Sequence, residues 1–344
     1  MANLSTNYMG LKLKSPVIAG SSGLTNSIDN VRQLASHGAG AVVLKSLFEE
    51  QIRFETEKYL DSGNDKVKPW KTTFDDIVNK RSYDYGEALD YISNFAKEHT
   101  LSDYLRFISD LKKSVDIPVI ASINCVSAYD WSYFARRIQE AGVDALELNV
   151  YVLPSNPLKS GEENEKVYFD VVNEVKKHVS IPVSLKIGYY FSGLTSKVIE
   201  LSNTGISSLV LFNRPFTPDF DIDKFEVTSG NILSTPAEYS HTLRWVGILA
   251  GRLGCEIAAS TGIHDAEAAI KQILAGAQVV QVASVLYKSG FSRINEIVSG
   301  ISNWMNTHRF STIKDFRGKM SQQKLDNPSI FERVQFMKLY SKIE

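Results

Sequence analysis

Eight short apolar segments, most of them followed by a stretch with helical spacing, constrain the fold of this chain more than any other feature. They are Pro16–Ala19, Ala41–Leu44, Pro118–Ile123, Ala145–Asn149, Pro182–Ile187, Ser208–Phe212, Glu256–Ser260 and Val279–Val282. Helices are predicted over Ser27–His37, Trp131–Glu140, Glu165–His178, Thr195–Asn203 and Ala266–Leu274. Apolar strands that alternate with helices in this way indicate repeated βαβ units.

Eight strands with helical connections favour a closed (β/α)8 TIM barrel of the α/β class. An open doubly wound sheet usually has fewer strands and ranks second. We expect one barrel domain over residues 1–320 and a C-terminal extension over residues 321–344. Two long segments, near residues 49–100 and 213–238, interrupt the βα rhythm. Both follow predicted strands, so we expect them over the C-terminal mouth, where barrel active sites are built.

Composition and charge narrow the function classes. The 38 basic and 39 acidic side chains give a net charge of -1, so we expect no broad field that would attract nucleic acid or an anionic membrane. No apolar run approaches the length of a membrane span, and the polar N-terminus lacks a signal pattern. With two cysteines, Cys125 and Cys255, no disulfide framework is indicated. These features predict a cytoplasmic protein.

Several common catalytic motifs are absent from the sequence. The six histidines have no metal-ligand spacing, so no metal site is expected, and there is no Walker loop or dinucleotide glycine motif. Cys125 follows Asn124 at a predicted strand end. We expect its thiol to have a packing role rather than a nucleophilic one.

Polar residues and glycines stand at almost every predicted strand end. Because these tips face the mouth of a barrel, they are the candidates for chemistry. They are Ser22, Gly23, Lys45, Ser46, Asn124, Asn149, Lys186, Asn213, Thr261, Gly262, Ala283 and Ser284.

Two of these tips are lysines. Lys45 and Lys186 each end an apolar run, and an ammonium placed in an apolar barrel is costly unless it meets an anion. The ordinary alternative is a lysine stem that extends its charged head to solvent. Two lysines on one rim favour a bound anionic ligand.

The last two strands end in turns that suit a phosphate. Ser260-Thr261-Gly262 and Ala283-Ser284 each precede a predicted helix start. Backbone N–H groups in such turns bind phosphate, and phosphate sites after the seventh and eighth strands recur in barrels. The alternative is that Thr261 and Ser284 act only as helix N-caps. Their position after the two final strands favours the phosphate.

Taken in order, these motifs resemble the dihydroorotate dehydrogenase family of flavin mononucleotide (FMN) barrels. The resemblance spans roughly residues 4–319 and is carried by an ordered set of short motifs rather than by any single one. They are Ser15-Pro16-Val17, Ser22-Gly23, Lys45-Ser46, Leu148-Asn149, Leu185-Lys186, Phe212-Asn213, Ser260-Thr261-Gly262, Val280-Gln281-Val282-Ala283-Ser284 and Phe310–Lys319.

The resemblance implies an FMN cofactor and oxidation of dihydroorotate to orotate in pyrimidine biosynthesis. In the family reaction the substrate C6 gives hydride to flavin N5 while a base removes the C5 proton. Lys186 would lie near flavin N1 and O2 and act in catalysis. Ser22, Gly23, Lys45, Ser46, Asn124 and Asn149 would bind the cofactor, and Gly262, Ala283 and Ser284 its phosphate. Lys45, Asn149, Asn213 and Arg214 are the candidate substrate-binding residues.

The sequence departs from the family in the substrate half of the site. The family base, a Cys or Ser, lies in a loop of the form Asn-x-Ser-Cys-Pro-Asn, which here reads Asn149-Val150-Tyr151-Val152-Leu153-Pro154-Ser155-Asn156. Val152 or Leu153 takes the base position, and neither can accept a proton. Ser155 or Tyr151 could replace the base only if the loop bends differently. The family's Asn-rich substrate loop is also missing from residues 47–91.

Three hypotheses follow. The chain is an FMN oxidoreductase that acts on dihydroorotate with an unusual base, a paralogue that acts on another small anionic substrate, as Arg214 suggests, or a non-catalytic flavin-binding barrel. An aldolase that uses Lys186 as a Schiff base ranks below these, because Lys45 and the phosphate turns would then need separate explanations. The resemblance further implies a homodimer, and fumarate is allowed as the electron acceptor.

Overall fold

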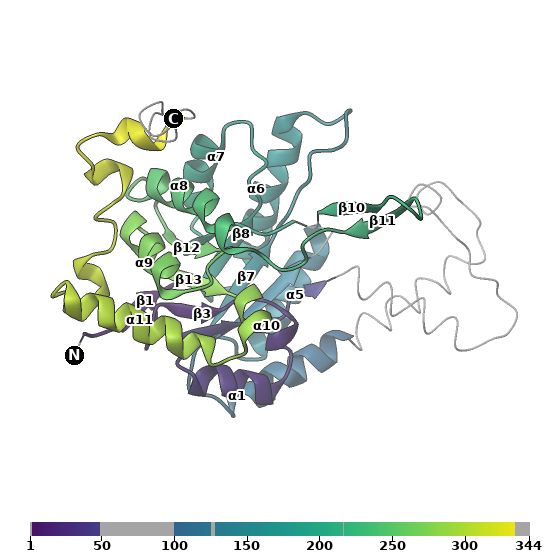
Figure 1. Ribbon diagram of the computed structural model, residues 1–344. Helices are drawn as coiled ribbons and strands as arrows, with labels where there is room; N and C mark the ends of the chain where they lie inside the picture. Colours follow the sequence, from purple (N-terminus) through teal and green to yellow (C-terminus); the bar gives the residue numbers. More distant parts are fainter. Residues whose placement is uncertain (1, 49–99, 125–127, 216, 334–344) are drawn as a thin grey trace, which may run out of the picture.

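The computed structural model describes residues 2–48, 100–124, 128–215 and 217–333, and eight of its strands close into a parallel barrel (Figure 1). Because β13 pairs with β3, and β4 pairs with β6, the ring is complete. In spatial order the strands are β3 (Val17–Ala19), β4 (Ala41–Val43), β6 (Val119–Asn124), β7 (Ala145–Asn149), β8 (Val183–Ile187), β9 (Ser208–Leu211), β12 (Glu256–Ser260) and β13 (Val279–Val282). All eight predicted apolar segments form strands, which confirms the (β/α)8 barrel. A two-residue strand, β5 (Leu47–Phe48), pairs with the end of β6.

Helices surround the barrel. The five that the sequence predicts are α1 (Ile28–Ser36), α5 (Ala128–Glu140), α6 (Gly161–His178), α7 (Leu194–Ser202) and α9 (Ala266–Ala275). The helix start predicted at Ala283-Ser284 is that of α10 (Ser284–Ser289). Three more helices were not anticipated: a helix over residues 100–112, α8 (Tyr239–Leu249) and α11 (Arg293–Thr307). In α11 the buried residues Ile294, Ile297, Ile301 and Met305 recur at helical spacing, so this helix has one apolar face toward the barrel.

The inside of the barrel changes from apolar to polar along its axis. At its N-terminal end, the hairpin of β1 (Thr6–Tyr8) and β2 (Leu11–Leu13) packs its Tyr8 and Leu13 side chains against inward residues such as Ile18. Strand side chains alternate between faces, so the residues two places further along also face the interior. Among them, Ser122, Glu147, Ser260 and Gln281 are polar and buried. The C-terminal half of the barrel is therefore suited to a polar ligand.

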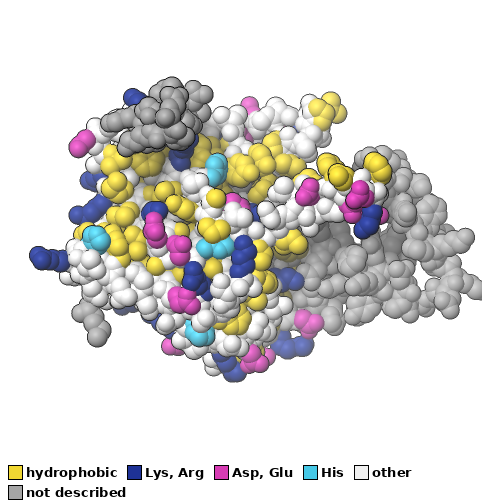
Figure 2. All heavy atoms as spheres, viewed as in Figure 1, with side chains coloured by type: hydrophobic (Ala, Val, Ile, Leu, Met, Phe, Trp, Pro, Cys, Tyr) yellow, Lys and Arg dark blue, Asp and Glu magenta, His cyan; other side chains and the backbone are white. Residues whose placement is uncertain are grey.

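The predicted insertions are described in part. Residues 49–99 lie outside the described residues, as do Cys125 and residues 334–344. The second insertion contains the hairpin of β10 (Pro218–Asp221) and β11 (Glu226–Ser229), which extends away from the barrel (Figure 1). Its Phe220 and Phe225 side chains are exposed, and apolar side chains gather at this end in Figure 2.

The C-terminal segment packs along the outside of the barrel. Three short turns of 3-10 helix, η3 (Ile313–Asp315), η4 (Gln322–Lys324) and η5 (Pro328–Phe331), follow α11. The backbone N–H groups of Gly318 and Met320 donate to the carbonyls of Ile273 and Leu274, at 2.9 and 2.8 Å. Among the described helices, none has the length and apolar character needed to cross a membrane.

Candidate active site

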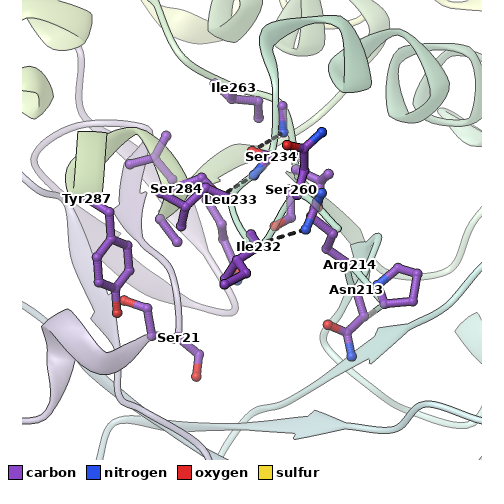
Figure 3. A pocket seen from close by; sticks show the side chains of 18 of the residues that line it. Ser21, Asn213, Arg214, Ile232, Leu233, Ser234, Ser260, Ile263, Ser284 and Tyr287 are labelled. Atoms are coloured by element: carbon purple, nitrogen blue, oxygen red, sulfur yellow. Dashed lines mark hydrogen bonds between the residues drawn. The ribbon is translucent and has the colours of Figure 1, made fainter. Parts of the chain in front are cut away.

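A cavity of about 940 Å³ lies at the C-terminal mouth of the barrel. Its volume is at the upper end of the range found for ligand pockets. The ends of β3, β8, β9, β12 and β13 contribute to its wall, as does the segment 229–234 after β11. Figure 3 shows Ser21 and Tyr287 on one side of this space and Asn213 and Arg214 on the other.

The two turns predicted to bind phosphate lie together in the wall of this cavity. Gly262, Ala283 and Ser284 all line it, and Thr261 and Gly262 both adopt positive φ angles, of 78° and 77°. Thr261 is not an N-cap, because its hydroxyl donates to the Phe212 carbonyl at 3.1 Å and the N-cap of α9 is Asp265. The N-cap of α10 is Ala283, which provides no side-chain capping bond. The alternative reading as simple N-caps is therefore not what the structure shows.

Ser234 connects the two turns. Its backbone N–H donates to the Ser284 hydroxyl at 2.9 Å, while its own hydroxyl accepts a long bond of 3.4 Å from the Gly262 N–H (Figure 3). The same hydroxyl contacts His264 Nε2 at 3.1 Å, and Lys288 donates to the Ser234 carbonyl at 2.7 Å. Burial, and then the charge of Lys288, lower the pKa of His264. Sequence reasoning missed Ser234, because it lies in an irregular segment with no strand or helix pattern.

Lys186 lies in the wall of the cavity, near the C-terminal end of β8. Its side chain is nine-tenths buried on β8, and in the part of the chain that the structure describes its ammonium has no hydrogen bond or close ion pair. A buried ammonium without a close anion is unfavourable, so this position favours an anionic or electron-rich ligand group. The prediction that Lys186 faces a ligand site is consistent with this geometry.

An amide and hydroxyl network lies beside the cavity. Asn213 donates to Asn149 Oδ1 at 2.7 Å, and Asn124 donates to the Asn149 carbonyl at 2.7 Å. The Asn149 amide also donates to Ser46 at 3.4 Å, and Ser46 contacts Ser21 at 3.1 Å. Of these five residues, Ser21 and Asn213 line the cavity, while Ser46, Asn124 and Asn149 support them from behind.

The remaining candidates have different positions. Ser22 and Gly23 line the cavity, whereas the half-buried Lys45 is not part of its wall. Arg214 lines it too, but its guanidinium donates to Glu238 at 2.8 Å and to the Ile232 carbonyl at 2.9 Å. Burial alone would raise the pKa of Glu238. The hydrogen bonds from Arg214 and Thr235 have a larger, opposite effect, so the pKa of Glu238 is lowered. The charge of Arg214 is therefore largely compensated.

Ser155 lies apart from the cavity. Its side chain is exposed in an irregular segment after β7, and it does not line the cavity. Tyr151, the other residue considered as a base, packs against Tyr190 and next to Gly188, again outside the cavity wall. In the described part of the chain, the segment after β7 therefore supplies no proton acceptor to the site.

Two further residues at the site were not predicted as site residues. Gln281 lies mid-strand on β13 and Tyr287 on α10, and both line the cavity. The signal for Gln281 was present, since a polar residue between Val280 and Val282 at an inward position of a buried strand is unusual. Tyr287 follows a strand by several residues, so no strand-end rule could identify it.

Sequence comparisons relate the chain to a known family. A sequence model described as dihydroorotate dehydrogenase matches residues 3–305. The catalytic subunit of dihydroorotate dehydrogenase B (NAD(+)) from Thermoplasma acidophilum is 29% identical over 326 residues, covering 92% of this chain and 99% of that protein. The protein of the same name from Pyrococcus abyssi is 26% identical over 320 residues, covering 92% and 98%. The chain belongs to the dihydroorotate dehydrogenase family.

Proposed function

We propose that this protein is an FMN-dependent oxidoreductase that oxidises dihydroorotate to orotate. The family supports an oxidoreductase of this type. The observation that carries the proposal is the buried Lys186 ammonium, which has no close anion among the described residues and lies in the same cavity as the paired turns at Gly262 and Ser284. When bound, FMN would supply the acceptor for the hydride of the substrate.

The residues of the cavity fit FMN in two respects. The N–H groups of the turn at Thr261–Gly262 and the Ser284 hydroxyl form a polar corner suited to a phosphate. Lys186 would place a positive charge at the opposite, buried part of the cavity, where it would stabilise negative charge on the ring system. Ser22 and Gly23 would line the space between.

The amide network would orient the substrate. Asn213 lines the cavity, and its side-chain amide donates a hydrogen bond to the Asn149 side chain, which fixes the orientation of the Asn213 amide. A primary amide presents both a donor and an acceptor, which matches the N–H and C=O groups of a pyrimidine ring. We propose that Asn213 contacts the substrate in this way and that Asn149 positions it from behind the wall. We further propose that the protein is cytoplasmic and acts as a homodimer.

A second candidate is oxidation or reduction of a different small substrate by the same FMN site. It is favoured by the position of Ser155, which is exposed and outside the cavity, so that the described part of the chain offers no base in the usual loop. The ion pair of Arg214 with Glu238 weakens the argument that the second substrate is anionic.

Anaerobic titration of the FMN-loaded protein with dihydroorotate separates the two candidates. The first predicts that the absorbance of the bound flavin near 450 nm bleaches in proportion to added dihydroorotate, and that Lys186→Met slows this bleaching. If the flavin is bleached by dithionite but not by dihydroorotate, the first candidate is wrong and a substrate panel tests the second.

A further inference from the structure

A carboxylate lies inside the barrel beneath the cavity. Glu147 on β7 is fully buried, and its Oε2 accepts a 2.7 Å hydrogen bond from the Gln281 side-chain amide on β13. In the closed ring β7 and β13 are on opposite walls, so this bond spans the interior. Barrel interiors are normally filled by branched apolar side chains, and fully buried carboxylates are rare unless they are paired.

The pair leaves two oxygens without partners. Among the described residues, neither Glu147 Oε1 nor Gln281 Oε1 accepts a hydrogen bond. In the described part of the chain, Lys186 is the cation that interacts electrostatically with Glu147, and this interaction favours the ionised carboxylate. On the sheet Lys186 pairs with Asn149, and Glu147 lies two residues further into the barrel. The carboxylate is therefore diagonally below the ammonium, on the neighbouring strand.

Because this arrangement places one unpaired ammonium above one carboxylate, we propose that Glu147 is the positioning residue of Lys186 and balances its charge beneath the cavity. The inference rests on the proposed FMN function. Gln281 holds the carboxylate in place, and it also lines the cavity, so it connects the buried acid with the ligand space. With Glu147 ionised, the ammonium and carboxylate together are neutral. With Glu147 protonated, the pair carries one positive charge toward the ligand.

The surroundings of Glu147 make its charge sensitive to pH. Burial raises its pKa, while Lys186 and the Gln281 hydrogen bond oppose this rise. The other titratable group facing it is Tyr8 of the N-terminal hairpin, whose pKa burial also raises, so it stays neutral. The strand neighbours Ser122 and Ser184 carry no charge. As the pH falls, protonation of Glu147 should therefore increase the positive charge under the ligand.

Glu147→Gln tests this proposal, because it removes the charge and keeps the shape. At a given potential, the ratio of reduced, anionic flavin to oxidised flavin should be about tenfold higher in the variant than in the parent. This corresponds to a rise of about 30 mV in the midpoint potential of the bound flavin. The difference should be largest above the pKa of Glu147 and should disappear as the pH falls below it. Glu256→Gln, which removes a partly buried carboxylate at the other end of the barrel, is the control and should leave the potential unchanged. Equal potentials in the parent and Glu147→Gln across the pH range would overturn the proposal.

A second measurement works without FMN and also covers the case that Glu147→Gln folds poorly. Lys186→Met alone leaves a buried, uncompensated carboxylate, so it should be less stable to urea than the double variant K186M/E147Q. Equal stability of these two variants would show that the charges are not coupled and would overturn the inference. If the protein binds no FMN, the proposed function fails and this measurement still decides the inference. If FMN binds and is reduced normally but neither readout changes, only the inference fails.

Discussion

Gly262 is the position in the phosphate turns where a single methyl group should have the largest effect. Its φ of +77° lies in the left-handed region that side chains disfavour. A Cβ there would lie 2.1 Å from the backbone nitrogen of Tyr239 and 2.7 Å from the carbonyl carbon of Glu238. Both atoms belong to the backbone that enters α8, so no side chain can move aside to make room.

The expected magnitude follows from these two effects. A non-glycine residue in the left-handed region costs about 1–2 kcal/mol, and overpacking against a fixed backbone adds about 1–3 kcal/mol. The restriction of the unfolded chain offsets about 0.4–1 kcal/mol. We therefore expect Gly262→Ala to lower the free energy of unfolding by about 2–4 kcal/mol.

Gly10→Ala is the matched control. Gly10 has nearly the same φ, +78°, but a Cβ there would meet nothing within 4 Å, so only the backbone term remains. We expect a loss of about 0.5–1.5 kcal/mol for this variant. Urea unfolding of the FMN-free variants, followed by circular dichroism, measures both values, and FMN titration should show weakened binding for Gly262→Ala alone. Equal losses of stability in the two variants, or normal FMN binding by Gly262→Ala, would refute the reasoning.

Three further results are expected. Ser234→Ala removes the hydroxyl that contacts Gly262 and His264, so the free energy of unfolding should fall by about 1–2 kcal/mol and FMN should bind several-fold more weakly. The control variant Ser289→Ala changes an exposed serine and should alter neither stability nor FMN binding. Calorimetry measures both quantities. Lys186→Met should slow reduction of bound flavin by at least about tenfold in stopped-flow experiments, and an unchanged rate would rule out its assigned role. Because burial and Lys288 lower the pKa of His264 in the folded state, its contribution to stability should be complete above about pH 6.5 and be lost as the pH falls through its folded-state pKa. His264→Gln should flatten this slope in urea titrations, and parallel profiles would contradict it.

The sequence predicts the barrel well because its signal is local and repeated. Each strand is a short apolar run, several of them, such as Ala145–Asn149, preceded by a glycine turn, and the observed bounds differ from the predicted ones by no more than one residue at either end. The position of the two turns at the mouth of the barrel could be predicted for the same reason, since they directly follow strands. The hairpin β10–β11 lies within residues 213–238, which contain three prolines and no regular apolar period, and its strands are exposed, so no buried-face pattern marks them in the sequence. The helix α8 begins directly after this segment.

The residues predicted at the site divide between the cavity wall and positions behind it, for physical reasons. The rule that strand-end residues face the mouth does not distinguish the wall of the cavity from the residues behind it. Asn124 and Ser46 satisfy this rule, but they support the wall rather than line it. Ser234 comes from an irregular segment that only the folded barrel brings to the turns. Glu147 and Gln281 could have been found by counting alternate residues along their strands, because polar side chains at inward positions of a buried strand are uncommon.

The proposed FMN site at the mouth of the barrel is tested most directly by the flavin content of the purified protein. We expect a yellow protein whose absorbance spectrum and released cofactor correspond to about one FMN per chain, or an apoprotein that takes up added FMN to that ratio. A colourless protein that binds no added FMN in an equilibrium titration would contradict it.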